Sequence, residues 1–269
     1  MSNDFSNLFS VKGKTVVITG GSRGIGEMLA AGYLANGAKV IISSRKEKAC
    51  EETVERLKDQ FGGEIYAIPS DVGQMVGIQH LADEIAKRED KVDVLINNAG
   101  VAWGATLEEF PESGWDKVMD VNVKGIFFLF QKLIPLLRKS ASADDPARVI
   151  NIASIDGMHT SPFSGYAYGT SKAAVIHLTR FMASQHVGEH ILVNGIAPGP
   201  FPTWMLSTGV GFGGKTEGVD WDSVAKGNPS GRVGTPQDIA GLAMFLSSRA
   251  GAYISGHTIP CDGGIVSSS

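Results

Sequence analysis

The chain has 269 residues, of which 43% are apolar and 19% are charged. A chain of this length can bury a core large enough to fold without a disulfide or a metal ion. It carries 24 lysine and arginine residues against 28 aspartate and glutamate residues, and the net charge of −4 argues against a nucleic-acid or anionic-membrane surface. Glycine accounts for 34 of the 269 residues, a share about twice the usual ~7%. This excess indicates tight turns and close backbone approaches.

Nothing in the sequence predicts export or membrane insertion. The first residues lack the basic and apolar segments of a signal peptide, and no apolar run reaches about 18 residues. The two cysteines, Cys50 and Cys261, lie far apart in the sequence, which is typical of free thiols in a reducing compartment. We therefore expect a cytoplasmic protein.

Short, β-branched, nearly all-apolar runs alternate along the chain with longer amphipathic ones. We expect strands at 15–19, 39–43, 65–68, 92–96, 148–153, 192–196 and 257–260. We expect helices near 24–36, 47–60, 74–89, 114–138, 166–187 and 236–248. Strands that are apolar on both faces are typical of a buried parallel sheet. The sequence therefore predicts an α/β fold: a single doubly wound Rossmann domain over 1–269, with a seven-stranded parallel sheet and helices on both faces.

A glycine-rich turn follows the first strand and opens the first helix. It reads TGGSRGIG over 19–26 and supplies the candidate residues Gly20, Ser22, Arg23, Gly24, Ile25 and Gly26. Its glycines let the backbone approach a ligand and the helix N-terminus presents free N–H groups, so the turn can cradle a pyrophosphate. The same letters contain the G-x-S-x-G of α/β-hydrolases, with Ser22, Asp238 and His257 in the required order. In this chain the motif follows the first strand, and this position disfavours the hydrolase alternative.

The second strand ends in Ser43, Ser44, Arg45 and Lys46, without a carboxylate. NAD-binding enzymes need a carboxylate here for the ribose 2′-hydroxyl, whereas a hydroxyl and a guanidinium suit a 2′-phosphate. Ser44 and Arg45, with Arg23 closing from the other side, therefore predict NADP(H) as the cofactor. The alternative is that both arginines are only solvated surface residues.

Two further strand ends add candidates for binding the adenosine part of a dinucleotide. Asp71 and Val72 follow the third strand, and Asn98, Ala99 and Gly100 follow the fourth. Open α/β sheets bind ligands at the carboxyl ends of their strands. Taken singly, each segment is more typical of an ordinary turn.

A tyrosine and a lysine four residues apart, Tyr168 and Lys172, fall on one face of the helix at 166–187. A lysine cation favours tyrosinate, so we expect it to lower the tyrosine pKa toward the range for proton transfer. Ser154, at the end of the fifth strand, can hydrogen-bond a substrate carbonyl. Asn122 lies within the helix at 114–138, where a buried amide needs a partner. The Tyr–Lys pair alone is a weak signal, because chance gives about 0.3 such pairs.

The stretch 201–227 is typical of a substrate lid, although a disordered segment is the alternative. Its glycines favour flexibility and its apolar residues can anchor it over a ligand. They are Gly209, Gly211, Gly213, Gly214 and Gly218, with Trp204, Met205, Phe212 and Trp221. Trp204 joins Trp103 and Tyr166 as candidate walls of an apolar substrate pocket, unless the aromatic residues only anchor the segment to the body of the protein.

Two further expectations concern metals and assembly. No metal site is expected, because His186 and His190 are four residues apart but lack a third spaced ligand. The helices at 114–138 and 166–187 are too apolar for a single buried stripe, which predicts an isologous contact with a second copy of the chain.

These motifs occur in an order that resembles the short-chain dehydrogenase/reductase family over essentially the whole chain. The shared features are TGGSRGIG at 19–26, DV at 71–72, NNAG at 97–100, Asn122, Ser154, YGTSK at 168–172, PG at 198–199, Thr203 and DGG at 262–264. The resemblance implies that Tyr168 is the catalytic acid, Ser154 orients the substrate, Lys172 binds the ribose and tunes Tyr168, and Asn122 is a proton-relay amide. It also implies that Pro198, Gly199 and Thr203 contact the nicotinamide end, and that a four-helix interface builds a homotetramer or homodimer.

The sequence is more closely similar to NADPH-dependent β-ketoacyl reductases of the rhamnolipid-synthesis type. The similar stretches are 113–115, 135–143, 146–152, 166–169, 187–191 and 198–202. This similarity implies NADPH-dependent reduction of a ketone, of β-ketoacyl type, to a secondary alcohol. The alternatives are a non-catalytic dinucleotide-binding regulatory protein and a short-chain dehydrogenase acting on a sugar or polyol.

The chain departs from the family pattern in two places. Ser154 and Tyr168 are 14 residues apart, where 13 is commoner, so the intervening loop must bulge. Glu189 stands where carrier-protein reductases often have an arginine, which puts docking of an acyl carrier protein in doubt.

Overall fold

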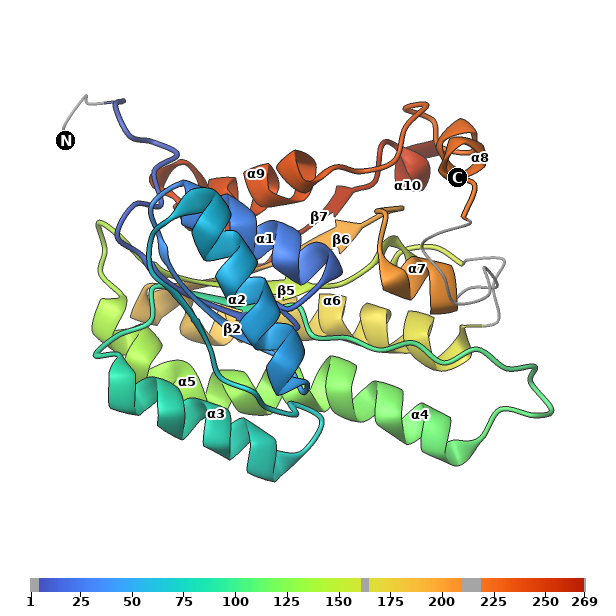
Figure 1. The fold of residues 1–269 in the computed structure, drawn as a ribbon, viewed down its shortest axis with the longest axis horizontal. Coiled ribbons are helices and arrows are strands. Elements are labelled where there is room, and N and C mark those ends of the chain that lie inside the picture. Colours follow the sequence, from blue (N-terminus) through green and yellow to red (C-terminus); the bar gives the residue numbers. More distant parts are fainter. Residues whose placement is uncertain (1–4, 161–164, 210–218, 269) are drawn as a thin grey trace.

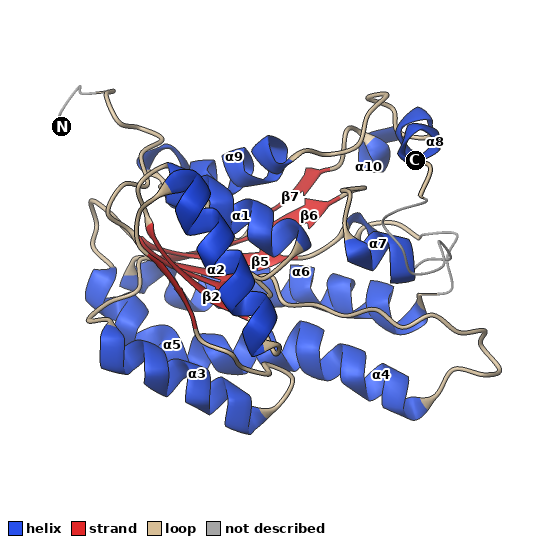
Figure 2. Ribbon diagram, in the orientation of Figure 1, coloured by secondary structure: helices blue, strands red, loops and turns tan. Residues whose placement is uncertain are grey.

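The computed structural model describes residues 5–160, 165–209 and 219–268. Its centre is a seven-stranded sheet in the order β3-β2-β1-β4-β5-β6-β7, and every neighbouring pair is parallel. The strands are β1 (Thr15–Thr19), β2 (Lys39–Ser43), β3 (Ile65–Ala67), β4 (Val94–Asn97), β5 (Ala147–Ile152), β6 (Ile191–Pro198) and β7 (Thr258–Cys261). Helices flank both faces of the sheet (Figure 2), which confirms the predicted α/β class and strand count.

The sheet carries a separate core on each face, because successive residues of a strand point to opposite sides. In β1, Val16 and Ile18 belong to one core and Val17 to the other. The first core lies under α1 (Gly24–Ala35), α2 (Glu47–Phe61) and α9 (Pro236–Ser247). The second lies under α3 (Met75–Arg88), α5 (Gly125–Ser140) and α6 (Tyr166–His186) (Figure 1).

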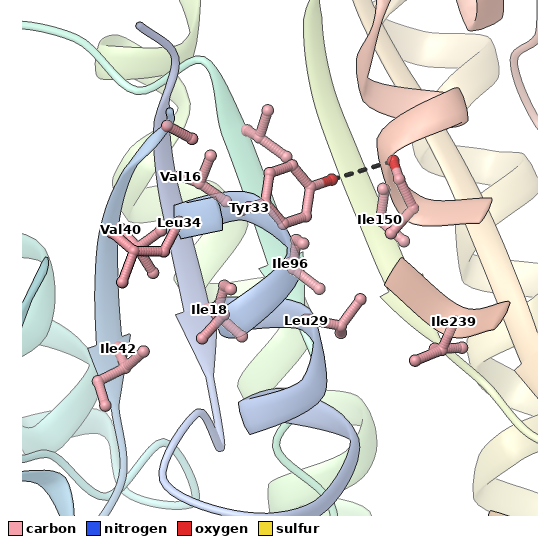
Figure 3. Packing of buried hydrophobic residues seen from close by; sticks show 14 of the residues in the cluster. Val16, Ile18, Leu29, Tyr33, Leu34, Val40, Ile42, Ile96, Ile150 and Ile239 are labelled. Carbon is pink, nitrogen blue, oxygen red and sulfur yellow. Dashed lines mark hydrogen bonds between the residues drawn. The ribbon is translucent and has the colours of Figure 1, made fainter. Parts of the chain in front are cut away.

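A buried tyrosine fixes the helix that begins at the glycine-rich turn. Figure 3 shows Tyr33 of α1 among aliphatic side chains of the first core. Its hydroxyl donates to the carbonyl oxygen of Ala243 at 3.0 Å and lies 2.5 Å from Ser247 Oγ, both on α9. The pairing satisfies the one polar atom of a ring that is otherwise packed in hydrocarbon, and it holds α1 against α9.

The helix predicted at 114–138 is present but its middle is not α-helical. It consists of α4 (Glu112–Met119), a π-helical turn η1 (Asp120–Lys124) and α5, which follow one another without a gap. A π-turn inserts an extra residue per turn and occurs frequently at functional sites. Its inner residue is Asn122, which is fully buried.

The stretch predicted as a lid contains two short helices, α7 (Trp204–Gly209) and α8 (Trp221–Lys226). Residues 210–218, with Gly211, Phe212, Gly213, Gly214 and Gly218, lie outside the described residues. The remaining elements are η2 (Ile155–Gly157), η3 (Val187–Glu189), η4 (Arg249–Gly251) and α10 (Ile265–Ser268). In the parts of the chain that the structure describes, no helix is both long and apolar enough to cross a bilayer.

Candidate active site

The carboxyl ends of the strands open into a cavity of about 890 Å³. All but one of the residues singled out from the sequence line it. Toward the cofactor these are Gly20, Ser22, Arg23, Gly24, Ile25, Gly26, Ser44, Arg45, Asp71, Val72, Asn98, Ala99, Gly100, Pro198, Gly199 and Thr203. Ser154, Tyr168, Lys172, Trp103, Tyr166 and Trp204 line the same cavity, whereas Asn122 does not.

The glycine-rich turn is tied to the end of β4 by an asparagine. The Asn98 amide donates to the carbonyl oxygens of Thr19 and Gly20 at 2.9 and 3.2 Å. A Cβ on Gly20, whose φ is +66°, would lie 2.9 Å from Ala99 Cα, and one on Gly26 would lie 2.2 Å from Gly20 O. Only glycine permits this packing. It places the N-terminus of α1 at the cavity wall, where free N–H groups can bind a phosphate.

The end of β2 presents hydroxyls and cations to the cavity. Ser44 Oγ lies 2.8 Å from Ser22 Oγ and 3.1 Å from Cys50 Sγ, so the two serines are held together. Arg45 is exposed beside them. The buried Ser43 Oγ has no hydrogen-bond partner within the described residues. Because no carboxylate follows β2, this set fits a cofactor with a 2′-phosphate.

Arg23 lines the cavity and makes a contact that the sequence did not predict. Its guanidinium stacks 4.3 Å from the centroid of the Trp204 ring, a cation–π contact between the glycine-rich turn and α7. Next to it, a Cβ built on Gly24 would lie 3.3 Å from Thr203 Cγ2. The expected pocket wall Trp204 therefore also contacts the cofactor cradle.

The hydrolase alternative finds no support in these contacts. Ser22 pairs with Ser44, and Asp238 is engaged by Arg232 at 2.6 Å and by the backbone and side chain of Thr235. Asp238 thus completes the capping box of α9.

The three catalytic candidates converge from two elements. Ser154 lies two residues after the end of β5, and Tyr168 and Lys172 are one turn apart at the start of α6. The Ser154 side chain hydrogen-bonds Tyr168. Lys172 Nζ donates to the carbonyl oxygen of Ile152 at 2.7 Å and lies 5.5 Å from the centroid of the Tyr168 ring.

The protonation of this pair differs from the sequence-based expectation. Burial raises the pKa of Tyr168 to about 12, an effect that the Ser154 hydrogen bond opposes and Asp156 reinforces. Burial lowers the pKa of Lys172 to about 8. The expected lowering of the tyrosine pKa by Lys172 is therefore not seen; desolvation dominates because it penalises the tyrosinate anion. At neutral pH Tyr168 is protonated and can act as an acid.

Asn122 does not line the cavity, and its side chain is fully buried and hydrogen-bonded. Its Oδ1 accepts from the Val101 N–H at 2.8 Å, and its Nδ2 donates to Val101 O and Ser171 Oγ, each at 3.0 Å. Ser171 Oγ in turn donates to Tyr168 O at 2.7 Å. These bonds join the loop after β4 to the first turn of α6, and the proton-relay role of Asn122 stays a prediction.

Aromatic and apolar side chains wall the substrate half of the cavity. Tyr166 packs edge-on against Phe110, with ring centroids 6.1 Å apart. Trp103 covers Gly114, where a Cβ would lie 2.7 Å from the indole. Met158, Met205 and Leu206 also line the cavity.

Two polar residues of the cavity, Asp156 and His159, were missed in the sequence. They follow Ser154 in and after turn η2, within the longer Ser–Tyr spacing. The unusually long spacing between Ser154 and Tyr168 was the sequence feature that could have drawn attention to them. Residues 161–164, between the same Ser154 and Tyr168, lie outside the described residues.

Glu189, the other departure from the family pattern, is engaged in ion pairs. It contacts Arg138 of α5, and its Oε1 lies 3.0 Å from His186 Nδ1. Within the described ranges, no group of three or more His, Cys, Asp or Glu residues could hold a metal ion.

Comparison with known proteins agrees with this geometry. The family model described as Enoyl-(Acyl carrier protein) reductase matches residues 20–266. The chain is 46% identical over 256 residues to the rhamnolipids biosynthesis 3-oxoacyl-(acyl-carrier-protein) reductase of Pseudomonas aeruginosa, covering 95% of this chain and 97% of that protein. It is 36% identical over 262 residues to the 5-keto-D-gluconate 5-reductase of Escherichia coli, covering 97% and 98%.

A solved structure shares the whole architecture. The Pseudomonas aeruginosa RhlG/NADP active-site complex matches with a TM-score of 0.89 and 44% identity, over 97% of this chain and 100% of that one. The motif order, the parallel sheet and these relatives lead to one conclusion: the chain belongs to the short-chain dehydrogenase/reductase family and is an oxidoreductase.

Proposed function

We propose that the protein reduces a ketone of 3-oxoacyl type to a secondary alcohol with NADPH. The observation that carries the proposal is the single cavity, which joins a phosphate cradle and a basic strand end to Tyr168 and an apolar substrate wall. The similarity to a 3-oxoacyl reductase and to an NADP complex supports it.

The cofactor part rests on the residues that would hold it. The N-terminus of α1 would bind the pyrophosphate, Ser44 and Arg45 the 2′-phosphate, and Asp71 with Asn98 to Gly100 the adenosine. Pro198, Gly199 and Thr203 would lie at the nicotinamide end. The glycines of the turn let a ligand approach the backbone closely. The Ser43 hydroxyl, which has no hydrogen-bond partner among the described residues, is available to a polar ligand at the same wall.

Catalysis would follow from protonation states already set by the fold. When bound, NADPH supplies a hydride to the carbonyl carbon. Ser154 hydrogen-bonds the carbonyl oxygen and Tyr168 gives it a proton as negative charge develops there. Lys172, charged below about pH 8, favours the tyrosinate left after that transfer. Asn122 holds the catalytic turn through Ser171.

A sugar acid or polyol is the second candidate. It is favoured by the similarity to 5-keto-D-gluconate 5-reductase and by the polar Asp156 and His159 in the cavity. Against it stands the hydrocarbon and aromatic surface of Trp103, Tyr166, Met158 and Leu206. Those side chains suit an acyl tail better than a chain of hydroxyls, which needs hydrogen-bond partners.

The substrate would be tested with a graded series. NADPH consumption is followed with 3-oxoacyl thioesters of rising chain length, with 5-keto-D-gluconate and L-sorbose, and with an enoyl thioester. Each buried methylene contributes about 0.8 kcal/mol, so kcat/KM should rise nearly fourfold per methylene until the pocket is full. A flat acyl series with faster turnover of the polyhydroxy ketone would overturn the acyl assignment.

The carrier of the acyl group is a further part of the proposal. Glu189 neutralises Arg138 on the surface formed by α5 and η3, which removes a positive contact for an acidic carrier protein. We therefore expect coenzyme A or pantetheine thioesters to be reduced about as well as the same acyl group on a carrier protein. A large preference for the carrier-bound substrate would contradict this expectation.

A further inference from the structure

An acidic side chain with no role in the proposed chemistry lies beside the catalytic pair. Asp156 follows Ser154 by two residues in turn η2, and its N–H donates to Ser154 Oγ at 3.2 Å. The side chain is half-buried and lines the cavity. Turn η2 packs tightly on α6, since a Cβ on Gly157 would lie 2.6 Å from the carbonyl carbon of Lys172. The backbone therefore holds Asp156 in place at the reaction centre.

No direct contact neutralises the Asp156 carboxylate: burial raises the pKa of this carboxyl, and His159 and Lys172 oppose that shift only through space. Among the described residues it accepts no hydrogen bond and makes no ion pair. The charged or titratable groups facing it are Lys172, His159 and Tyr168. Lys172 donates to Ile152 O instead, and the buried His159 Nε2 has no hydrogen-bond partner within the described ranges. Leaving a carboxylate unpaired in a partly buried site costs stability, and such a cost is concentrated at functional sites.

We infer that Asp156 selects substrate charge: the site accepts ketones that are neutral around the reacting carbonyl and rejects those with a carboxylate close to it. The inference rests on the proposed function and names the substrate class more narrowly. Because Asp156 lies two residues after Ser154 and lines the same cavity, a carbonyl bound by Ser154 and Tyr168 would bring its substituents near this carboxylate.

The size of the discrimination follows from Coulomb's law. Two like charges about 6 Å apart, at an effective dielectric constant of about 20, repel enough to reduce kcat/KM roughly 100-fold. Lys172 attracts a substrate carboxylate, and Asp156 offsets that attraction. Removing the aspartate charge would leave the lysine unopposed, so carboxylate substrates should gain most. A 3-oxoacyl thioester is neutral at this position, whereas a free 3-oxo acid is not.

A matched pair of small substrates tests the inference. Acetoacetate and methyl acetoacetate differ only in charge beside the same ketone. With NADPH and the full-length protein, the ester should exceed the acid in kcat/KM, by less than the about 100-fold that an isolated Asp156 charge would give, because Lys172 attracts the acid. In Asp156→Asn this ratio should fall about tenfold or more, mainly because the acid improves. The inhibition constant of acetoacetate in the ester assay gives a second measure of how well the acid binds, and it does not require the acid to be reduced.

Two further variants separate selectivity from folding. Asp156→Glu restores the charge and should restore the ratio. Asp83→Asn removes an exposed carboxylate on α3, far from the cavity lining, and should leave the ratio at its wild-type value. Equal reduction of ester and acid by the wild type, or an equal loss for both in Asp156→Asn, would overturn the inference. A wild type that reduces neither these ketones nor the longer 3-oxoacyl thioesters would instead overturn the proposed function.

Discussion

Replacing Arg45 by alanine tests whether the end of β2 recognises a 2′-phosphate. Arg45 is exposed and lines the cavity next to Ser44, whose hydroxyl is held 2.8 Å from Ser22 Oγ. A hydrogen bond to a charged group contributes about 1.5–3 kcal/mol. Because the guanidinium is exposed, solvent screening places this contact near the lower end, about 1.5 kcal/mol. Arg45→Ala should therefore raise the Kd for NADPH roughly tenfold and leave the Kd for NADH nearly unchanged.

The measurement is a titration of each cofactor into wild-type and variant protein by calorimetry, at low and at high salt. Added salt should weaken NADPH binding more in the wild type than in Arg45→Ala, because screening acts on the charge that the variant lacks. Arg88→Ala serves as the control, since Arg88 is exposed on α3 and pairs with Glu84. Equal losses for NADPH and NADH, or no loss for either, would refute the assignment of Arg45 to the phosphate.

Three further predictions address the chemistry and the assembly. Tyr168→Phe should lower kcat at least about 10²-fold by removing the acid, while calorimetry shows NADPH binding intact; more than a tenth of wild-type kcat would contradict its role. Reductive kcat/KM should fall as pH rises through about 8, where Lys172 loses its charge; a profile flat to pH 10 would contradict this. Phe181 on α6 is 60% exposed, so Phe181→Asp should lower the mass measured by light scattering and Val76→Asp on α3 should not. A wild-type monomer at micromolar concentration would rule out the expected contact between copies.

The fold was predictable because its signals are local. A run such as Val16, Val17 and Ile18 is apolar on both faces, and only a strand covered on both sides satisfies that pattern. The strand ends then gave the positions of the site residues, since parallel strands end at the same edge of a sheet. The glycines of the turn were predictable for the same reason, although the hydrogen bonds that Asn98, just after β4, makes to the turn were not predicted.

Contacts between distant segments were not predictable from single motifs. Arg23 stacks on Trp204, about 180 residues further along the chain, and no local pattern encodes that pairing. The π-turn at Asn122 was hidden for another reason: α4 and α5 each have a regular helical pattern, and the five residues between them are too few to show a period of their own. Asp156 looks like an ordinary turn residue in the sequence, and only the cavity shows that it faces the catalytic pair.

The catalytic pair shows how one physical cause sets two opposite shifts. Burial penalises whichever form is charged, so it raises the pKa of Tyr168 to about 12 and lowers the pKa of Lys172 to about 8. Between them lies a pH range in which the tyrosine keeps its proton and the lysine loses its charge. Alcohol oxidation needs tyrosinate, and the alkaline pH that forms it would also remove the lysine charge that favours it. Ketone reduction needs protonated tyrosine and charged lysine together, and both are present near neutral pH. Near neutral pH, burial of the reaction centre therefore supplies both protonation states that the reductive step uses.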